Sequence, residues 1–190
     1  IARAKAAGAY VSLAHPEWYT MTSDEALLVS AADAVEIYNY SCVLSSGRGS
    51  GTIIADFLLN EGHKISFTAT DDSHFHLPDF AGGWVMVAAP ELSQGAIIAA
   101  LKAGHHYSST GADFNDISID KGILTVQTTP VQSIVLSGEG HLASACHGNN
   151  ITVARFDLSE FTSQWFRITA RGFSDQMAWS NPYFKNDLGL

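Results

Sequence analysis

The sequence ISFTATDDSHFH at residues 65–76 joins an apolar segment to a dense group of polar side chains. Apolar and β-favouring residues dominate residues 64–69, which predicts a buried strand. Two carboxylates and two imidazoles follow within six positions, at Asp71, Asp72, His74 and His76. Carboxylate oxygen and imidazole nitrogen are the ligands that zinc, manganese and iron take in proteins. The stretch therefore predicts a strand whose carboxyl end carries ligand chemistry.

Short β-type segments and helical segments alternate from the start of the chain to about residue 111. Ser23 and Ser93 are suitable N-caps, and Gly62 and Gly104 are suitable helix stops. Strands and helices that alternate with short loops are typical of a parallel α/β sheet or barrel. We therefore predict an α/β domain over residues 1–112, with strands at 9–14, 34–38, 64–69 and 84–88 and helices from 23, at 52–60 and at 93–102.

The pattern changes after Gly111. Short segments, several of them alternating between apolar and polar residues, are separated by the turn sequences KG, SGEG and GNN, and no convincing helix is present. This pattern predicts a second domain over residues 113–190, an antiparallel β-sandwich or small barrel. Its expected strands are residues 115–120, 123–128, 131–136, 151–158 and 165–171.

Composition narrows the classes of function. The chain has 190 residues, of which 46% are hydrophobic, and no run reaches the roughly 18 apolar residues of a membrane span. Ten basic against 19 acidic residues give a net charge of −9, which argues against nucleic-acid binding but is compatible with a small anionic substrate held at a metal. Cys42 and Cys146 lie far apart and predict no disulfide framework, so no cellular compartment is indicated.

Three predicted strands end in polar chemistry, at His15, at Glu36 with Asn39, and at Asp72 with His74. In a parallel sheet the carboxyl ends of the strands open on one face, so these side chains are expected to converge there. Each has a simpler interpretation: His15 as a loop residue, and the Asp-Asp-Ser-His segment as a helix cap or turn. A carboxylate inside an apolar strand needs a cation or good hydrogen-bond donors, which makes Glu36 the most unusual of the three.

Six short segments together suggest a family: AHPEW (14–18), VEIYN (35–39), ATDDSH (69–74), GGWVMV (82–87), ALKAGHHYSSTG (100–111) and AWSNP (178–182). In order and spacing they resemble the later half of two-domain metal-dependent hydrolases of the PHP (polymerase and histidinol phosphatase) superfamily. The resemblance covers nearly the whole chain. It implies that residues 1–112 are the carboxyl-terminal part of a distorted (βα)7 barrel and that residues 113–190 are a small antiparallel β-sandwich.

The resemblance also implies an activity. Members of this family hydrolyse phosphoesters with divalent metal ions, so zinc, manganese or iron is the expected cofactor; some two-domain members cleave aryl carbamates or related esters instead. Carried over residue by residue, His15 of the A-H-P segment and Asp72 and His74 of the D-x-H segment correspond to metal ligands. Glu36 corresponds to a position that lines the site, and we expect it to contribute to metal binding.

Two further residues are candidates for catalysis on a small anionic or ester substrate. His76 is a candidate proton donor to the leaving group, and Arg48, in the glycine-rich segment SSGRGSG, is a candidate for binding an anionic group. The family's first H-x-H motif is absent, and the chain opens on ARAKAAG, which is typical of a helix end. We therefore expect an upstream barrel segment or an oligomer partner to complete the site.

A non-catalytic binding module is the competing hypothesis. In that case the second domain recognises a carbohydrate or a protein partner, and Trp165, Trp179 and Phe184 supply stacking surfaces. Aromatic residues in strands are more often part of the core.

Overall fold

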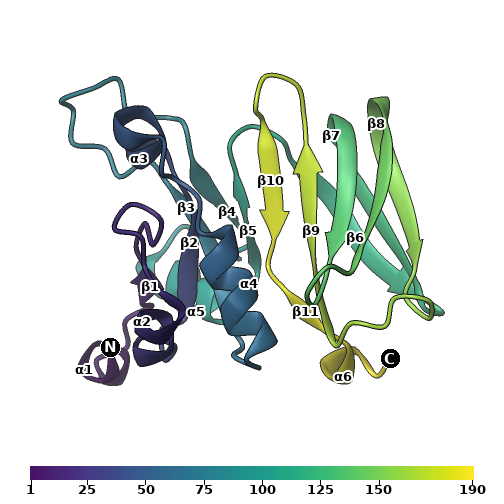
Figure 1. The fold of residues 1–190 in the computed structure, drawn as a ribbon, viewed down its shortest axis with the longest axis horizontal. Coiled ribbons are helices and arrows are strands. Elements are labelled where there is room, and N and C mark those ends of the chain that lie inside the picture. The colour runs from purple at the N-terminus through teal and green to yellow at the C-terminus, as the bar shows by residue number, and fades with distance from the viewer. The chain divides into compact units, whose positions relative to one another are not determined.

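The computed structural model describes all residues 1–190, and it divides into two compact units, residues 1–108 and residues 109–190 (Figure 1). The domain boundary predicted between residues 112 and 113 concerns which parts of the chain fold independently. It stays a prediction. No helix in either unit is long and apolar enough to cross a membrane.

The first unit is built around a parallel sheet of three strands in the order β1-β2-β3. Ser12 of β1 pairs with Ala34 of β2, and Val35 of β2 pairs with Phe67 of β3. The middle strand is buried along nearly its whole length, as expected for a parallel strand covered on both faces. The strand bounds are β1 (Ser12–Leu13), β2 (Ala34–Asn39) and β3 (Ser66–Thr70).

Short helices and two further strands complete the first unit. Helix α4 packs on β2, where its buried Leu58 and Leu59 join Val35 and Phe67 in the core. Thr22 begins α2 with a complete capping box to Glu25, which satisfies backbone N–H groups at the helix start. These elements are α1 (Ala2–Ala6), α2 (Ser23–Leu28), α3 (Tyr40–Ser46), α4 (Thr52–Asn60), β4 (Trp84–Val87), α5 (Gln94–Lys102) and β5 (His106–Ser109).

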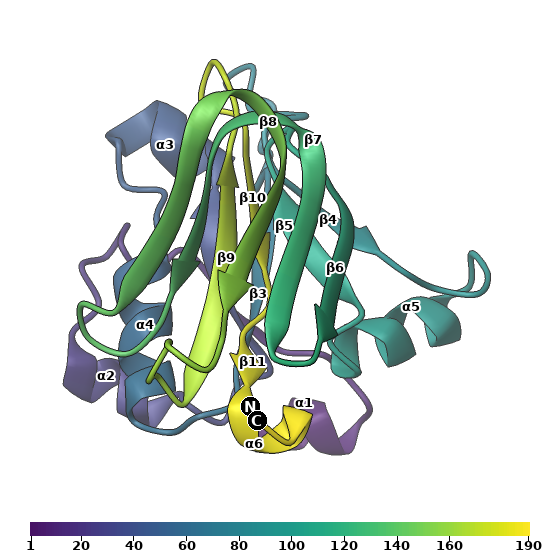
Figure 2. The ribbon, with the colours of Figure 1, turned by 90° about the vertical axis from the view of Figure 1, so that its right-hand side faces the viewer.

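The second unit is an antiparallel, curled sheet centred on the long strand β7. β7 pairs along its length with β8, with β6 near its start and with β9 near its end, and Figure 2 shows β7 and β8 bending together. Leu124, Leu136, Phe166 and Ile168 are among the fully buried residues of its core. The elements are β6 (Phe114–Asp120), β7 (Ile123–Ser137), β8 (Ala143–Asp157), β9 (Trp165–Arg171), β10 (Met177–Ser180), β11 (Tyr183–Phe184) and α6 (Lys185–Leu188).

The predicted fold class was wrong. Strands make up 38% of the chain and helices 21%, the six helices are short, and the larger sheet is antiparallel, so the chain is not part of a (βα)7 barrel. Helices do separate β1, β2 and β3, which explains the alternation in the sequence. However, β4 and β5 are not strands of that parallel sheet, so the alternation does not extend into a barrel. The β-rich character predicted for the later part of the chain is confirmed.

Candidate functional site

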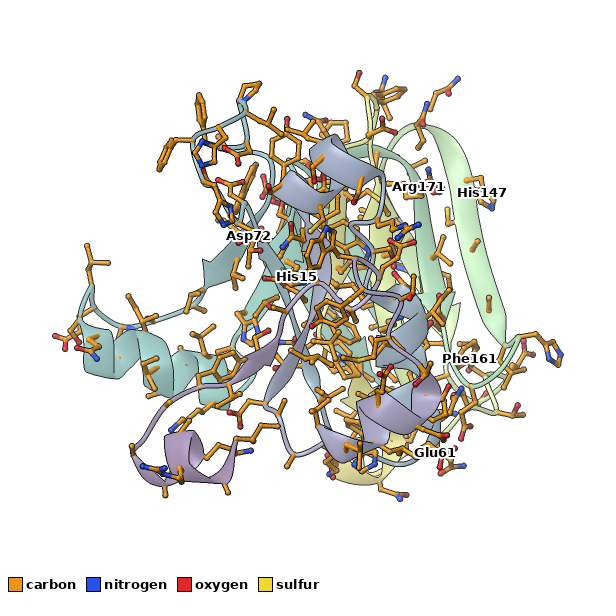
Figure 3. All side chains as sticks on the ribbon, turned by 60° about the vertical axis from the view of Figure 1, so that its left-hand side comes forward. His15, Glu61, Asp72, His147, Phe161 and Arg171 are labelled. Carbon is orange, nitrogen blue, oxygen red and sulfur yellow. The ribbon has the colours of Figure 1, made fainter.

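The carboxyl ends of β1 and β3 open onto a cavity of about 270 Å³ in the first unit, which we call the His15 cavity. Figure 3 shows His15 and Asp72 on neighbouring segments at this end of the sheet. Of the four residues predicted to bind metal, His15, Asp72 and His74 line it and Glu36 does not. The full lining is His15, Trp18, Ser41, Cys42, Ser45, Asp72 and His74.

Glu36 lies behind this cavity rather than in its lining. Glu36 is only 7% exposed, and its carboxylate accepts three hydrogen bonds. Oε2 accepts from the His15 backbone N–H at 2.7 Å and from Asn39 Nδ2 at 2.9 Å, and Oε1 accepts from Thr70 Oγ1 at 2.7 Å. Three donors satisfy the buried charge without a cation, and together they tie the ends of all three parallel strands to one side chain.

The backbone of His15 has an unusual conformation, with φ at +29°. The hydrogen bond from its N–H to Glu36 holds this conformation. The imidazole ring meets the edges of Trp18 and Tyr19, with ring centroids 5.3 and 5.2 Å apart. Nδ1 is buried and has no hydrogen-bond partner. A buried imidazole nitrogen without a partner is a candidate ligand atom, because burial without compensation is costly.

Asp72 and His74 are placed by the turn that follows β3. Asp72 also has a positive φ, +50°, and its Oδ2 accepts a hydrogen bond from Asn39 Nδ2 at 3.1 Å. The Asp72 carbonyl oxygen lies 2.7 Å from His74 Nδ1, so that nitrogen is engaged by the backbone. His74 is exposed at the mouth of the cavity, which leaves its Nε2 as the ring nitrogen for a ligand.

Two carboxylates fold the loop between β3 and β4. Asp71 accepts the backbone N–H groups of Ala81, Gly82 and Gly83 at 2.7 to 2.9 Å. Asp79, almost fully buried, accepts from the N–H groups of His74 and Phe75 and from the Ser73 hydroxyl. The hydrogen bond from the His74 N–H is the main cause that lowers the pKa of Asp79. This loop therefore takes one defined course past the cavity.

The two predicted catalytic residues lie apart from the lining. His76 and Arg48 are both exposed, and neither lines the His15 cavity. His76 follows the turn that His74 occupies, and Arg48 lies after the end of α3, where its backbone N–H donates to the Cys42 carbonyl.

Sequence reasoning missed four residues of the lining, Trp18, Ser41, Cys42 and Ser45. The last three come from α3, which begins directly after β2 with Asn39 Oδ1 capping the Cys42 N–H. Their position just past the end of a predicted strand was the sequence feature that could have placed them at the site. Burial, then the nearby Asp72 and Glu36 carboxylates, raises the pKa of the Cys42 thiol to about 11, so this thiol is neutral at physiological pH.

The donor types around the cavity fit a divalent metal, since imidazole and carboxylate are both present beside the unpartnered His15 Nδ1. Their placement fits less well: no group of three His, Cys, Asp or Glu side chains is arranged to hold an ion. No family model matches the chain, and no curated protein or solved structure is significantly similar to it. The resemblance to PHP hydrolases therefore stays a hypothesis.

Proposed function

We propose that the chain belongs to a metal-dependent hydrolase, above all a phosphoesterase, whose site is the His15 cavity. One observation carries this proposal: His15, Asp72 and His74 come from two separate strand ends and line the same cavity. Their chemistry is that of a zinc, manganese or iron site. Hydrolysis of a carboxylic ester or a carbamate at the same site is the alternative chemistry.

His15 Nδ1, the Asp72 carboxylate and His74 would hold a divalent ion there, and such an ion would supply activated water and polarise the substrate oxygen. Glu36 acts on the site through its hydrogen bond to the His15 N–H, which sets where the imidazole points. The Ser41 and Ser45 hydroxyls line the same cavity and offer hydrogen bonds that orient a substrate.

We infer that metal binding by this chain is weak. No three of the candidate ligand side chains are arranged to hold an ion, so at least one of them has to move before three ligands meet. His74 is exposed, but it can move only by giving up the contact between its Nδ1 and the Asp72 carbonyl oxygen, whereas His15 is held by its ring contacts. A site that must rearrange binds more weakly than one that is preorganised.

The competing binding-module hypothesis loses part of its basis. Trp165 and Trp179 are only 2% and 5% exposed, so they belong to the core of the second unit and offer no stacking surface. Phe184, partly exposed, is the remaining candidate of the three.

Hydrolysis of p-nitrophenyl phosphate and p-nitrophenyl acetate tests the proposal. The purified chain is treated with chelator and then supplied with zinc or manganese. We expect metal-dependent release of p-nitrophenol that His15→Ala abolishes and that His141→Ala, an exposed histidine of the second unit, leaves unchanged. Activity that survives both the chelator and His15→Ala contradicts the proposal.

A further inference from the structure

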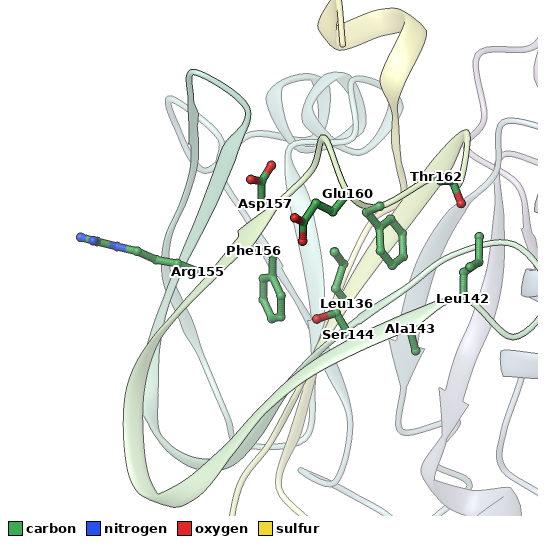
Figure 4. Close-up of a pocket in the computed structure, with 10 residues that line it drawn as sticks. Leu136, Leu142, Ala143, Ser144, Arg155, Phe156, Asp157, Glu160 and Thr162 are labelled. Atoms are coloured by element: carbon green, nitrogen blue, oxygen red, sulfur yellow. The ribbon is translucent and has the colours of Figure 1, made fainter.

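The second unit contains a cavity of about 310 Å³, which β7, β8 and the segment after β8 line (Figure 4). Leu136, Phe156 and Phe161, three of its apolar lining residues, are only 0%, 6% and 8% exposed. This cavity therefore offers a ligand little apolar surface. Exposed apolar surface is present in the first unit, and part of it adjoins the His15 cavity.

The loop between β3 and β4 exposes three large apolar side chains within six residues. Phe75 is 81% exposed, Leu77 is 45% exposed and Phe80 is 60% exposed. We call residues 74–81 the Phe75 loop. Apolar side chains that gather on a protein surface mark a place where an apolar ligand, a protein or a membrane binds.

Hydrogen bonds hold the Phe75 loop at both ends. At its start, the Asp79 carboxylate accepts from the backbone N–H groups of His74 and Phe75 at 3.0 and 3.2 Å. At its end, Asp71 accepts from the Ala81 N–H at 2.7 Å. Phe75 has a φ of +59°, a strained conformation for a bulky residue. Because the exposed ring gains little packing in return, a role at the surface explains this strained position better than a role in folding.

The Phe75 loop adjoins the His15 cavity through His74, which lines the cavity. Phe75 is the next residue, and consecutive Cα atoms are about 3.8 Å apart. The volume of the cavity, about 270 Å³, lies just below the range of small-molecule sites, about 300 to 1,000 Å³. The cavity therefore takes a reacting group, and the rest of a larger substrate has to lie over its rim. Trp18, the one large apolar side chain in the lining, is 49% exposed, so apolar surface begins inside the cavity.

We propose that the substrates are amphiphilic esters, an inference that rests on the hydrolase function proposed above. The phosphate or ester group lies in the His15 cavity, and an aliphatic chain lies over Trp18 and the Phe75 loop. Contact with these side chains removes the aliphatic chain from water, which favours binding. A membrane is the competing occupant of the loop, and it would leave the cavity beside the loop without a role.

Ethyl phosphate and hexyl phosphate test this assignment, because their alcohol leaving groups have nearly equal reactivity and differ in chain length. Release of phosphate is measured with the metal-supplied chain. We expect kcat/KM for hexyl phosphate to exceed that for ethyl phosphate about 10- to 100-fold, since the four additional CH2 groups are partly buried. The ratio of the two values cancels any difference in the folded fraction between variants.

A double substitution, Phe75→Asn with Phe80→Ser, places the chain on the loop. Asparagine is chosen because it tolerates a positive φ. This variant should lower the ratio at least about 5-fold, since two of the apolar side chains are removed. Leu92→Ser, which removes a 96% exposed leucine of the same unit, is the matched control and should keep the wild-type ratio.

Ethylphosphonate and hexylphosphonate separate this inference from the proposed function, because their carbon–phosphorus bond is not hydrolysed. Calorimetry should show tighter binding of hexylphosphonate to the metal-supplied chain, and the double variant should lose most of this preference. Such binding without hydrolysis of either phosphate would contradict the hydrolase function and support the apolar surface.

Other outcomes would overturn the role of the Phe75 loop and leave the hydrolase function standing. These are equal kcat/KM values for the two phosphates, equal binding of the two phosphonates, or a preference for the longer chain that the double variant keeps. Binding to phosphatidylcholine vesicles that requires Phe75 and Phe80, without any chain-length preference, would instead assign the loop to a membrane surface.

Discussion

Glu36→Gln is the sharpest single substitution for separating the structural role of this carboxylate from a direct role in metal binding. Glu36 accepts three hydrogen bonds, two at Oε2 and one at Oε1. Glutamine keeps one oxygen, which can remain with the His15 N–H and the Asn39 amide. Its NH2 group must then face Thr70 Oγ1, whose hydroxyl turns from donor to acceptor.

The expected cost follows from these bonds. A hydrogen bond to a charged group contributes about 1.5 to 3 kcal/mol and a neutral one about 0.5 to 1.5 kcal/mol, so each of the two retained bonds loses about 1 kcal/mol. Removing a buried charge offsets part of this loss. We therefore expect Glu36→Gln to lower the free energy of unfolding by about 1 to 3 kcal/mol.

Urea unfolding followed by circular dichroism measures this change, with and without chelator. The loss should be the same in both conditions, because Glu36 is satisfied by protein donors and not by a cation. Glu61→Gln, an exposed carboxylate in the same unit, is the control and should be neutral. An unchanged free energy of unfolding, or a loss that appears only when metal is present, would refute the structural role assigned to Glu36.

Gly51→Ala should prevent stable folding, because its Cβ would overlap the backbone carbonyl of Glu36. Gly95→Ala on α5, where nothing lies within 4 Å of the added Cβ, should instead stabilise the chain by about 0.5 to 1 kcal/mol. Thermal melts of the two variants distinguish these outcomes. Burial lowers the pKa of His106 below its usual 6.5, so the unfolded chain binds protons more readily and stability should fall as pH drops below about 6.5. His106→Gln should flatten this part of a plot of melting temperature against pH, and an unchanged slope would exclude His106 as the cause. Residues 109–190 expressed alone should melt cooperatively with a β-type circular dichroism spectrum, since they hold their own core; a disordered spectrum would contradict this.

Local patterns predicted the elements of the first unit better than they predicted its architecture. The expected strands at residues 34–38 and 64–69 overlap β2 (Ala34–Asn39) and β3 (Ser66–Thr70), and the helix expected at 52–60 is α4. Periodicity and caps are local properties, so a sequence can show them directly. Whether a later strand joins the same sheet depends on partners far along the chain, and the strand expected at 84–88, β4, looked like the continuation of a parallel sheet that in fact stops at three strands.

For the candidate site, too, the sequence predicted local position better than three-dimensional arrangement. Strand-end position predicted that His15, Asp72 and His74 would lie at one edge, because parallel strands bring their carboxyl ends together, and the three residues line one cavity; their role as metal ligands stays a prediction. It could not show that the three donors fail to converge, since that depends on side-chain rotamers. The neighbouring carboxylates Asp71 and Asp72 have different roles. Asp71 accepts hydrogen bonds from three backbone N–H groups of the following loop. The sequence was compatible with such a turn but did not show which of the two carboxylates forms it.

A calorimetric titration with zinc and manganese tests the central claim, metal binding in the His15 cavity, most directly. The wild-type chain, His74→Ala and His141→Ala are compared after removal of adventitious metal with chelator. We predict weak, saturable binding to the wild-type chain and to His141→Ala, and no binding at that site in His74→Ala. Equal binding by His74→Ala and the wild-type chain, or no binding by the wild-type chain, would contradict the assignment.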